Sequence, residues 1–145
     1  MKSKLVIIIF AIGVILATAV SVYMSRTIDP VQKTITAVPS PDGRYKAVVE
    51  SLSHGGSAPF CYDTVSIYLA AYPNNFAESE LGYQVYWSPC ATPANPGDTP
   101  SVKWLANNEA QITYTQGPTP TDPSKLRKRV VDASKYVKIT YVERK

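Results

Sequence analysis

The chain has 145 residues, of which 45% are hydrophobic and 18% are charged. This length allows one domain with a modest core behind an apolar N-terminal run, and it excludes two domains of ordinary size. The formal net charge of +4 is unevenly distributed. Residues 26–123 contain five basic and nine acidic residues, whereas residues 124–145 contain eight basic and two acidic ones. The excess of positive charge therefore belongs to the C-terminal segment.

Residues 5–24 form an apolar run that contains no charged residue and is preceded by two lysines. A helix of this length covers the roughly 30 Å hydrocarbon core of a bilayer. Residues 1–25 are therefore predicted to be a membrane anchor or a cleavable signal peptide with a small-residue site near Ala19. The anchor is favoured because Tyr23 occupies an interfacial position and the run is long enough to span.

More positive charge precedes the apolar run than follows it, where Arg26 opens a linker over residues 26–33. This asymmetry predicts a cytoplasmic N-terminus and an extracytoplasmic domain over residues 34–145. We expect a single-pass protein of the cell inner membrane with a periplasmic C-terminal domain, so that the membrane is its first partner. Cleavage near Ala19 would instead give a periplasmic or secreted protein.

Residues 34–145 show an apolar period of two and closely spaced turn residues, which are typical of an antiparallel β domain. We predict a single all-β, sandwich-like domain of about six to seven strands. The clearest hairpin joins residues 34–38 to residues 44–52. Its turn, Ser40-Pro41-Asp42-Gly43, has the residues preferred in a type I turn.

Further strands are predicted over residues 63–72 and 83–88, because alternate residues there would give the two faces of each strand different side chains. In the first of them Val65 lies on one face, and Tyr68 and Tyr72 lie on the other. This second face is either covered by another strand layer or exposed as an interaction surface.

The C-terminal half contains a second hairpin, in which residues 102–105 pair with residues 110–116 and Trp104 belongs to the core. The last strand is predicted over residues 136–143. Residues 125–131 are expected to pair with it across a short turn.

Three long loops are predicted over residues 53–62, 89–100 and 117–124. Cys61 and Cys90 are the only cysteines, and an isolated pair in an oxidising compartment is expected to form one disulfide. That bond would hold the first two loops together at one end of the sheet. Because loops on a rigid scaffold carry binding residues, we expect the working surface there.

Aromatic residues favour a binding function, because tyrosine offers a large contact area with a polar tip and is enriched at interfaces. Several of them fall on or beside the loops that the disulfide would join. The candidate binding surface consists of His54, Phe60, Tyr62, Tyr68, Tyr72 and Tyr86.

A basic run occupies residues 125–129, and its candidate contact residues are Arg127, Lys128 and Arg129. One interpretation is a solvated strand edge that charge protects from aggregation. Another is contact with an acidic partner or with lipid headgroups. Nucleic acid is not expected as a partner outside the cytoplasm.

Two sequence stretches carry a resemblance. They resemble hairpins of TolB-type propeller blades and consist of Ser-Pro-Asp-Gly-Arg-Tyr at residues 40–45 and Trp-Leu-Ala-Asn-Asn-Glu-Ala-Gln-Ile-Thr-Tyr at residues 104–114. One blade alone cannot close a propeller. The wider order of these motifs resembles a group of small uncharacterised bacterial envelope proteins, in which a cysteine stands beside the first-loop glycine. Here Cys61 follows Gly55-Gly56 by several residues. The resemblance implies an envelope location and this fold, and it supplies no activity.

Catalysis would require a nucleophile with a base or a pair of carboxylates. No G-x-S-x-G, H-E-x-x-H or phosphate-binding glycine loop is present. Two thiols and one imidazole are a poor metal site in oxidising surroundings. We therefore expect no enzyme activity, no cofactor and no metal. The weak catalytic candidates are His54 with Ser53 or Ser57, Glu50 with Asp63, and Glu78 with Glu80.

Two functional hypotheses from different classes follow. The first is a membrane-tethered binding protein, inhibitor-like or immunity-like, that captures a protein partner in the envelope. The second is a structural or accessory component of an envelope membrane complex that uses the basic segment as its contact. A small secreted enzyme using His54 is a weaker third. The oligomeric state is not specified by the sequence.

Overall fold

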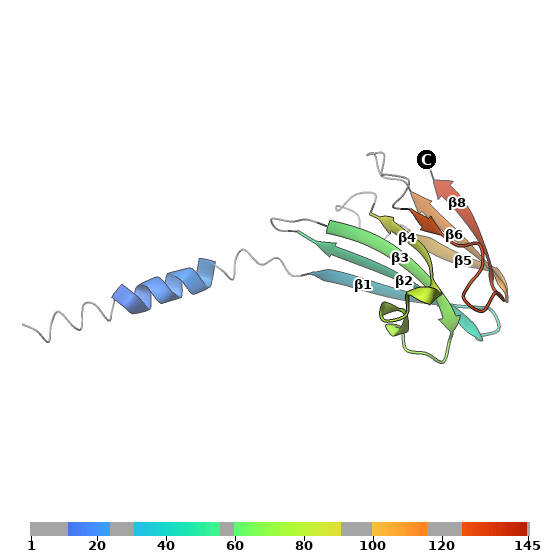
Figure 1. The fold of residues 1–145 in the computed structure, drawn as a ribbon, viewed down its shortest axis with the longest axis horizontal. Helices are drawn as coiled ribbons and strands as arrows, with labels where there is room; N and C mark the ends of the chain where they lie inside the picture. Colours follow the sequence, from blue (N-terminus) through green and yellow to red (C-terminus); the bar gives the residue numbers. More distant parts are fainter. Residues whose placement is uncertain (1–11, 24–30, 56–59, 91–99, 116–125, 145) are drawn as a thin grey trace, which may run out of the picture.

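The computed structural model describes residues 12–23, 31–55, 60–90, 100–115 and 126–144. Residues 12–23 are helical, as Figure 1 shows. Within the described part of the chain, no helix is long and apolar enough to cross a membrane. The predicted apolar run over residues 5–24 begins and ends outside the described residues, so the anchor and the signal peptide both stay predictions.

Two β-sheets form the domain, which confirms the predicted small all-β fold (Figure 1). The first sheet has the strand order β1-β2-β3-β4-β7, and the second has the order β5-β6-β8. The described residues thus contain eight strands, more than expected, and β7 has only two residues. The elements are β1 (Gln32–Pro39), β2 (Tyr45–His54), β3 (Phe60–Leu69), the 3-10 turns η1 (Phe76–Glu78) and η2 (Leu81–Tyr83), β4 (Gln84–Pro89), β5 (Ser101–Ala106), β6 (Glu109–Thr115), β7 (Arg127–Lys128) and β8 (Lys138–Arg144).

The first hairpin, β1–β2, forms at the predicted turn. The Gly43 amide donates to the Ser40 carbonyl at 2.9 Å, and the Ser40 hydroxyl donates to Asp42 Oδ1 at 2.7 Å. Gly43 has a φ of 69°, in the left-handed region that glycine adopts without steric cost. The turn aligns β2 antiparallel to β1 over the full length of β1, with Val38 opposite Ala47.

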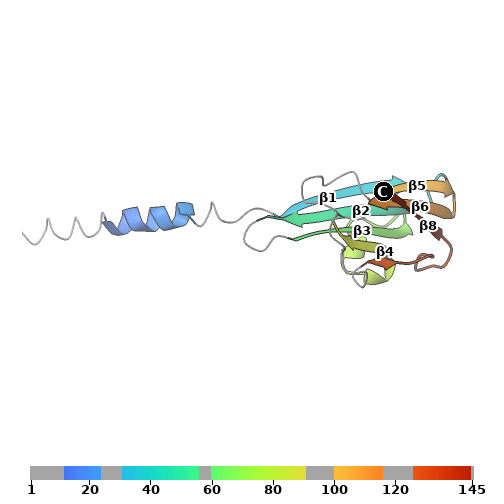
Figure 2. The same cartoon turned by 90° about the horizontal axis from the view of Figure 1, so that it is seen from above.

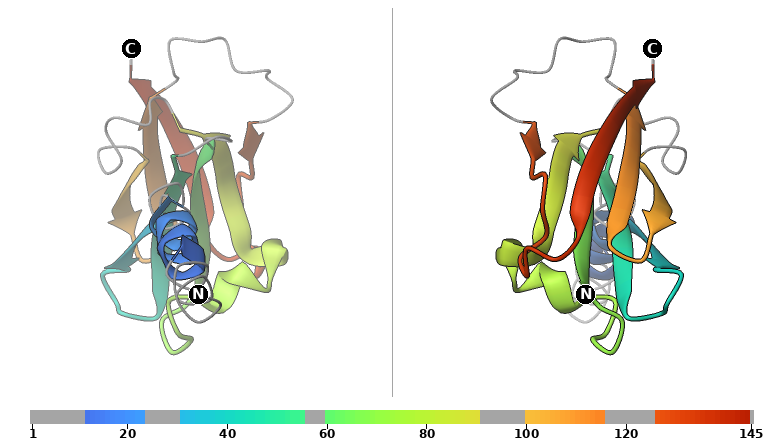
Figure 3. Two further views of the ribbon diagram at one scale, coloured as in Figure 1. Left: turned by 90° about the vertical axis from the view of Figure 1, so that its left-hand side faces the viewer. Right: turned by 90° about the vertical axis from the view of Figure 1, so that its right-hand side faces the viewer.

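The second sheet differs from the antiparallel arrangement that the sequence predicts. Strands β5 and β6 form the expected hairpin, but β8 pairs with β6 in parallel, with Ile112 opposite Tyr141. A parallel neighbour requires a long crossover connection, and residues 116–137 supply one. Figure 3 shows the chain leaving β7, running to the other end of the sandwich and returning in β8.

The predicted pairing of residues 125–131 with the last strand is therefore wrong in its main part. Strand β7 pairs with β4 on the first sheet, with Arg127 opposite Trp87. The two segments share one antiparallel bridge, between Val131 and Lys138, and the Ile139 amide donates to the Val130 carbonyl at 2.9 Å. Ile139 of β8 and Val137 just before it are buried in the core, which places this segment against the core on the side of the second sheet.

The core lies between the two sheets. Trp104 of β5 packs against it while only partly buried, and its indole Nε1 donates to the Val38 carbonyl at 2.9 Å. This bond joins β5 to β1, and Figure 2 shows both strands on the same side of the domain. The buried core residues are Tyr45, Ala47, Val65, Ile67, Val85, Tyr86, Ala110, Ile112, Tyr114, Val137 and Ile139.

Candidate functional site

A disulfide joins Cys61 at the start of β3 to Cys90 just after β4, as predicted, with 5.2 Å between the two Cα atoms. The Cys90 amide also donates to the Cys61 carbonyl at 3.1 Å. The bond fixes one end of the first sheet. Much of the two expected working loops, residues 56–59 and 91–99, lies outside the described residues.

Aromatic side chains line the outer face of the first sheet, the face turned away from the second sheet, near the disulfide. The ring centroids of His54 and Phe60 are 5.3 Å apart, those of Phe60 and Tyr62 are 6.3 Å apart, and those of Tyr62 and Trp87 are 6.2 Å apart. Three residues of the sequence-predicted binding surface therefore come together here. Trp87, which sequence reasoning missed, continues the row onto β4.

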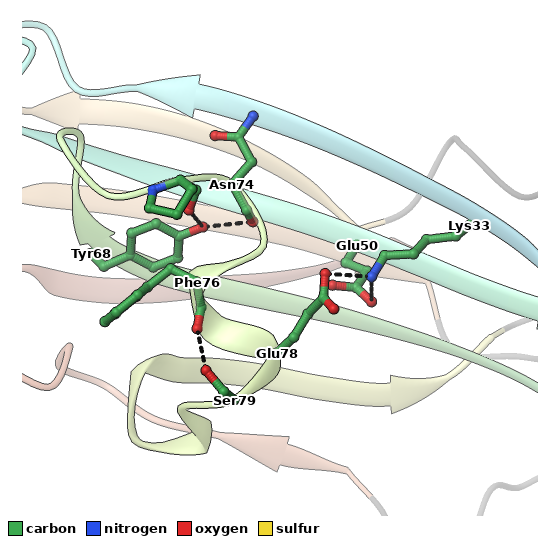
Figure 4. Close-up of polar contacts among 8 residues, drawn as sticks. Lys33, Glu50, Tyr68, Asn74, Phe76, Glu78 and Ser79 are labelled. Carbon is green, nitrogen blue, oxygen red and sulfur yellow. Dashed lines mark hydrogen bonds and ion pairs between the residues drawn. The ribbon is translucent and has the colours of Figure 1, made fainter.

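Tyr68 also lies on the outer face, but it is not part of an accessible surface, which corrects the sequence prediction. It is only 1% exposed because the connection over residues 70–83 folds back over it. Its hydroxyl donates to the Asn74 carbonyl at 2.8 Å, and its ring meets that of Phe76 edge to face at 5.5 Å (Figure 4). Burial, followed by the charges of Glu50 and Glu78, raises the pKa of Tyr68 to about 12.

Tyr72 belongs to the same covering segment. Its ring stacks on that of Phe76 at 4.3 Å while the residue stays 39% exposed. Lys46 holds the segment from the sheet below, because its ammonium donates to Asn74 Oδ1 at 2.8 Å and to the Tyr72 carbonyl. Tyr72 is thus accessible but lies in the covering segment, apart from the aromatic row.

Tyr86 is the second correction to the predicted binding surface. It is 2% exposed and packs in the core with its ring 5.6 Å from that of Tyr114. The register of β3 and β4 shifts between Val65 and Ser66, and Tyr86 comes opposite Val65. This irregularity turns Tyr86 inward and Trp87 outward, whereas strict alternation from Val85 predicts the reverse. Burial raises the pKa of Tyr86 to about 12.

Two adjoining hollows lie on the outer face between the aromatic row and the covering segment. The first has a volume of about 640 Å³, and the second has a volume of about 330 Å³. Both are lined by Tyr62, Leu81 and Gln84, so the two hollows share a wall, and we call the pair the outer-face groove. The first hollow is also lined by Phe60, Cys61, Trp87, Pro89 and Arg127, and the second by Lys33, Glu50, Leu52, Thr64, Ser66, Ala77 and Glu78.

The described residues that line the second hollow include a charged cluster with an excess of one negative charge. The Lys33 ammonium lies 2.6 Å from Glu78 Oε1 and 3.1 Å from Glu50 Oε1 (Figure 4). The hydrogen bond to Glu78 is the largest influence and raises the pKa of Lys33. Burial, the next largest, opposes this increase, and the hydrogen bond to Glu50 adds to it. The contact also ties η1 to the β1–β2 hairpin.

The candidate basic contact does not form a single patch, because its three residues diverge. Lys128 turns toward the aromatic rings between the sheets, with its ammonium 4.0 Å from the centroid of Tyr114. Arg129 donates from Nη1 to the Gly82 carbonyl at 2.6 Å and so holds η2 in place. Arg127 lines the first hollow, and within the described residues its guanidinium has no ion pair.

Two of the weak catalytic pairs are separated by the sheet itself, whereas the third lies beside the sheet, with Glu78 at the end of η1 and Glu80 just before η2. Glu50 lies on the outer face and Asp63 on the inner face, where Asp63 is buried and accepts a hydrogen bond from the Ser51 hydroxyl at 2.5 Å. Successive residues of a strand point to opposite faces, so Ser53 and His54 also diverge. Ser57 lies outside the described residues, within which no cluster of metal-binding side chains occurs.

Comparisons with known proteins give no identification: the chain matches no protein-family model, no curated protein and no solved structure. The resemblance to small envelope proteins therefore stays a prediction from the sequence.

Proposed function

We propose that the chain is a membrane-tethered extracytoplasmic binding protein without catalytic activity, and that the outer-face groove holds its protein partner. The observation that carries this proposal is the row of Phe60, Tyr62 and Trp87 along an open hollow of about 640 Å³. Aromatic side chains at the rim of a concave apolar surface are typical of binding sites.

The groove is held in shape from both sides, which supports this proposal. The Cys61–Cys90 disulfide fixes the strands beneath the aromatic row. On the other side, Lys33 and Arg129 hold η1 and η2 by the contacts described above. A preformed surface loses less conformational entropy when a partner binds, so more of the contact energy appears as affinity.

The basic segment supports the second hypothesis, an accessory component of an envelope complex, less well. Lys128 and Arg129 are occupied by contacts within the domain. Only Arg127 of the three faces an open hollow, and that hollow is part of the groove. The basic contact and the aromatic surface therefore converge on one site at Arg127.

Site-specific photocrosslinking in cells tests the proposal. A photoreactive phenylalanine analogue is introduced at Phe60 or Leu81 in the groove and, as matched controls, at Tyr136 or Leu105, which are comparably exposed elsewhere. We expect one envelope protein to be captured from both groove positions and from neither control. Capture of the same protein at equal yield from the controls, or capture from position 128 or 129 alone, would refute the groove as the binding surface.

A further inference from the structure

We propose that the outer-face groove recognises an extended peptide segment that carries an acidic residue and a bulky apolar residue at one end and a basic residue at the other. This inference rests on the proposed function and specifies the chemistry of the partner. It follows from the different linings of the two hollows and from the charges that they present.

The first hollow combines an apolar wall with a cation. Phe60, Trp87 and Pro89 supply the wall, and Leu81, which is 64% exposed, closes it from η2. An apolar side chain of a partner that fills this hollow gains roughly 25 cal/mol for each square ångström removed from water. Arg127 lines the same hollow. A planar guanidinium binds a carboxylate with two parallel hydrogen bonds, so an acidic group beside the apolar side chain is its natural complement.

The second hollow has the opposite preference. Its lining includes Glu50, Glu78, Thr64 and Ser66. One lysine balances only one of the two carboxylates, and the Glu78 side chain remains well exposed beside its ion pair. A basic side chain from the partner would therefore find both a charge and hydrogen-bond acceptors there.

A peptide fits this pattern better than a sugar chain does. Each sugar hydroxyl that enters a site has to find a hydrogen-bond partner, because a buried polar group without one is costly. Among the residues that the structure describes, the polar side chains of the first hollow belong to Tyr62, Gln84, Trp87 and Arg127. An extended peptide instead places alternate side chains into successive pockets, and it joins opposite charges to an apolar residue on one short segment.

Selection from random eight-residue peptides displayed on phage tests the inference on the full-length protein purified in mild detergent. We expect the selected peptides to share an acidic residue next to a large apolar one, with a basic residue at a fixed distance. A synthetic capped peptide of that sequence should lose about tenfold in affinity when its acidic residue is replaced by the corresponding amide.

Charge reversal in the protein makes the test specific. Arg127→Glu should convert the acidic preference of the selected peptides into a basic one. The matched control Arg144→Glu, at an exposed position on β8, should leave the selection unchanged. Thermal melting of both variants confirms that they are folded.

Three results would overturn the inference. The first is the absence of any enriched sequence, and the second is an enriched sequence that Arg127→Glu does not alter. The third is binding of the neutral oligosaccharide chitotetraose in competition with the synthetic peptide. If photocrosslinking still captures a protein from Phe60 and Leu81, the proposed function stands and only the peptide chemistry is wrong. If it captures none from these positions, the proposed function itself fails.

Discussion

The outer face of the first sheet carries a tyrosine near each end of β3, but one end is covered by another segment and the other end is open. Tyr62 and Tyr68 stand on the same face of β3, six residues apart. Tyr68 is covered by the segment over residues 70–83 and hydrogen-bonds to its backbone, whereas Tyr62 lines an open groove. The comparison shows that the pattern of a strand determines which face a side chain takes, and the length and anchoring of the next loop determine whether that face is closed.

The covered end should carry most of the stability. We expect Tyr68→Ala to lower the free energy of unfolding by about 3–5 kcal/mol, because it removes a buried aromatic ring and the anchor of the covering segment. Tyr68→Phe removes only the hydroxyl and should cost about 1 kcal/mol. Chemical denaturation measures both. If Tyr62→Ala at the open end is as costly as Tyr68→Ala, the contrast between the two ends is incorrect.

At the open end no described segment covers the outer face as residues 70–83 do at the other end, and we expect the disulfide to stabilise this end instead. It closes a loop with a sequence separation of 29 residues. Replacing both cysteines by serine should lower the free energy of unfolding by about 3–4 kcal/mol on the chain-entropy model. Hydrogen exchange of the double variant is measured under conditions that lie as far from its own unfolding midpoint as those used for the wild type. Amide protection should be lost first around position 61 and later around Tyr68. Uniform loss along β3 would contradict a local role.

A third prediction concerns the inner face directly beneath the open end, where Asp63 is buried. Burial raises the pKa of this carboxyl above its ordinary value, and the hydrogen bond from Ser51 opposes that effect only in part. The folded protein therefore holds this proton more tightly than the unfolded chain does. The stabilisation is complete at pH values below the unfolded pKa near 3.8 and is lost as the pH rises through the folded pKa.

Asp63→Asn removes this dependence, since the amide does not titrate. We expect the variant to gain stability relative to the wild type as the pH is raised from 3 to 7, as measured by melting temperature at each pH. Ser51→Ala should enlarge the effect because it removes the bond that favours the charged carboxylate. A wild type that gains stability relative to Asp63→Asn over this range would show that the folded pKa is lowered and would refute the prediction.

Much of the fold was predictable because it depends on local signals. The turn at Ser40-Pro41-Asp42-Gly43, the alternation in β3 and the cysteine pair are all readable within a few residues. The pairing of β7 with β4 and the parallel pairing of β8 with β6 were not predictable. Both depend on the connection between β6 and β8, whose sequence has no regular apolar period. Strict alternation also fails at β4, where the register shift opposite Val65 exchanges the sides of Tyr86 and Trp87.

The candidate site was partly predictable for the same reasons. His54, Phe60 and Tyr62 are near the disulfide in sequence and meet near it in space. Arg127 reaches the groove only through the β4–β7 pairing. Leu81 reaches it through the covering segment, whose turns carry no strand or helix pattern. A site assembled from distant segments cannot be read from any one of them.

The smallest expected effect on stability belongs to Phe60, and it separates a binding surface from a structural one. Phe60 is 43% exposed and its ring contacts His54 and Tyr62 at the rim of the groove. Phe60→Ala should therefore lower the free energy of unfolding by less than about 1 kcal/mol, since surface substitutions away from buried networks cost little. Its effect on binding should be larger, because aromatic residues at the centre of an interface often account for more than 1 kcal/mol each.

Tyr136 provides the matched control for this last prediction, because it has the same exposed fraction and stacks on Tyr45 at 5.4 Å outside the groove. Tyr136→Ala should also be mild in stability but neutral in binding. Titration of each variant with the crosslinked partner, alongside its melting curve, makes the measurement. Exposed aromatic residues occur both at the open end, near the disulfide, and at the other end, near Tyr136, and only contact with a partner distinguishes the two. If Phe60→Ala binds normally and Tyr136→Ala binds weakly, the functional surface lies near Tyr136 and not at the open end.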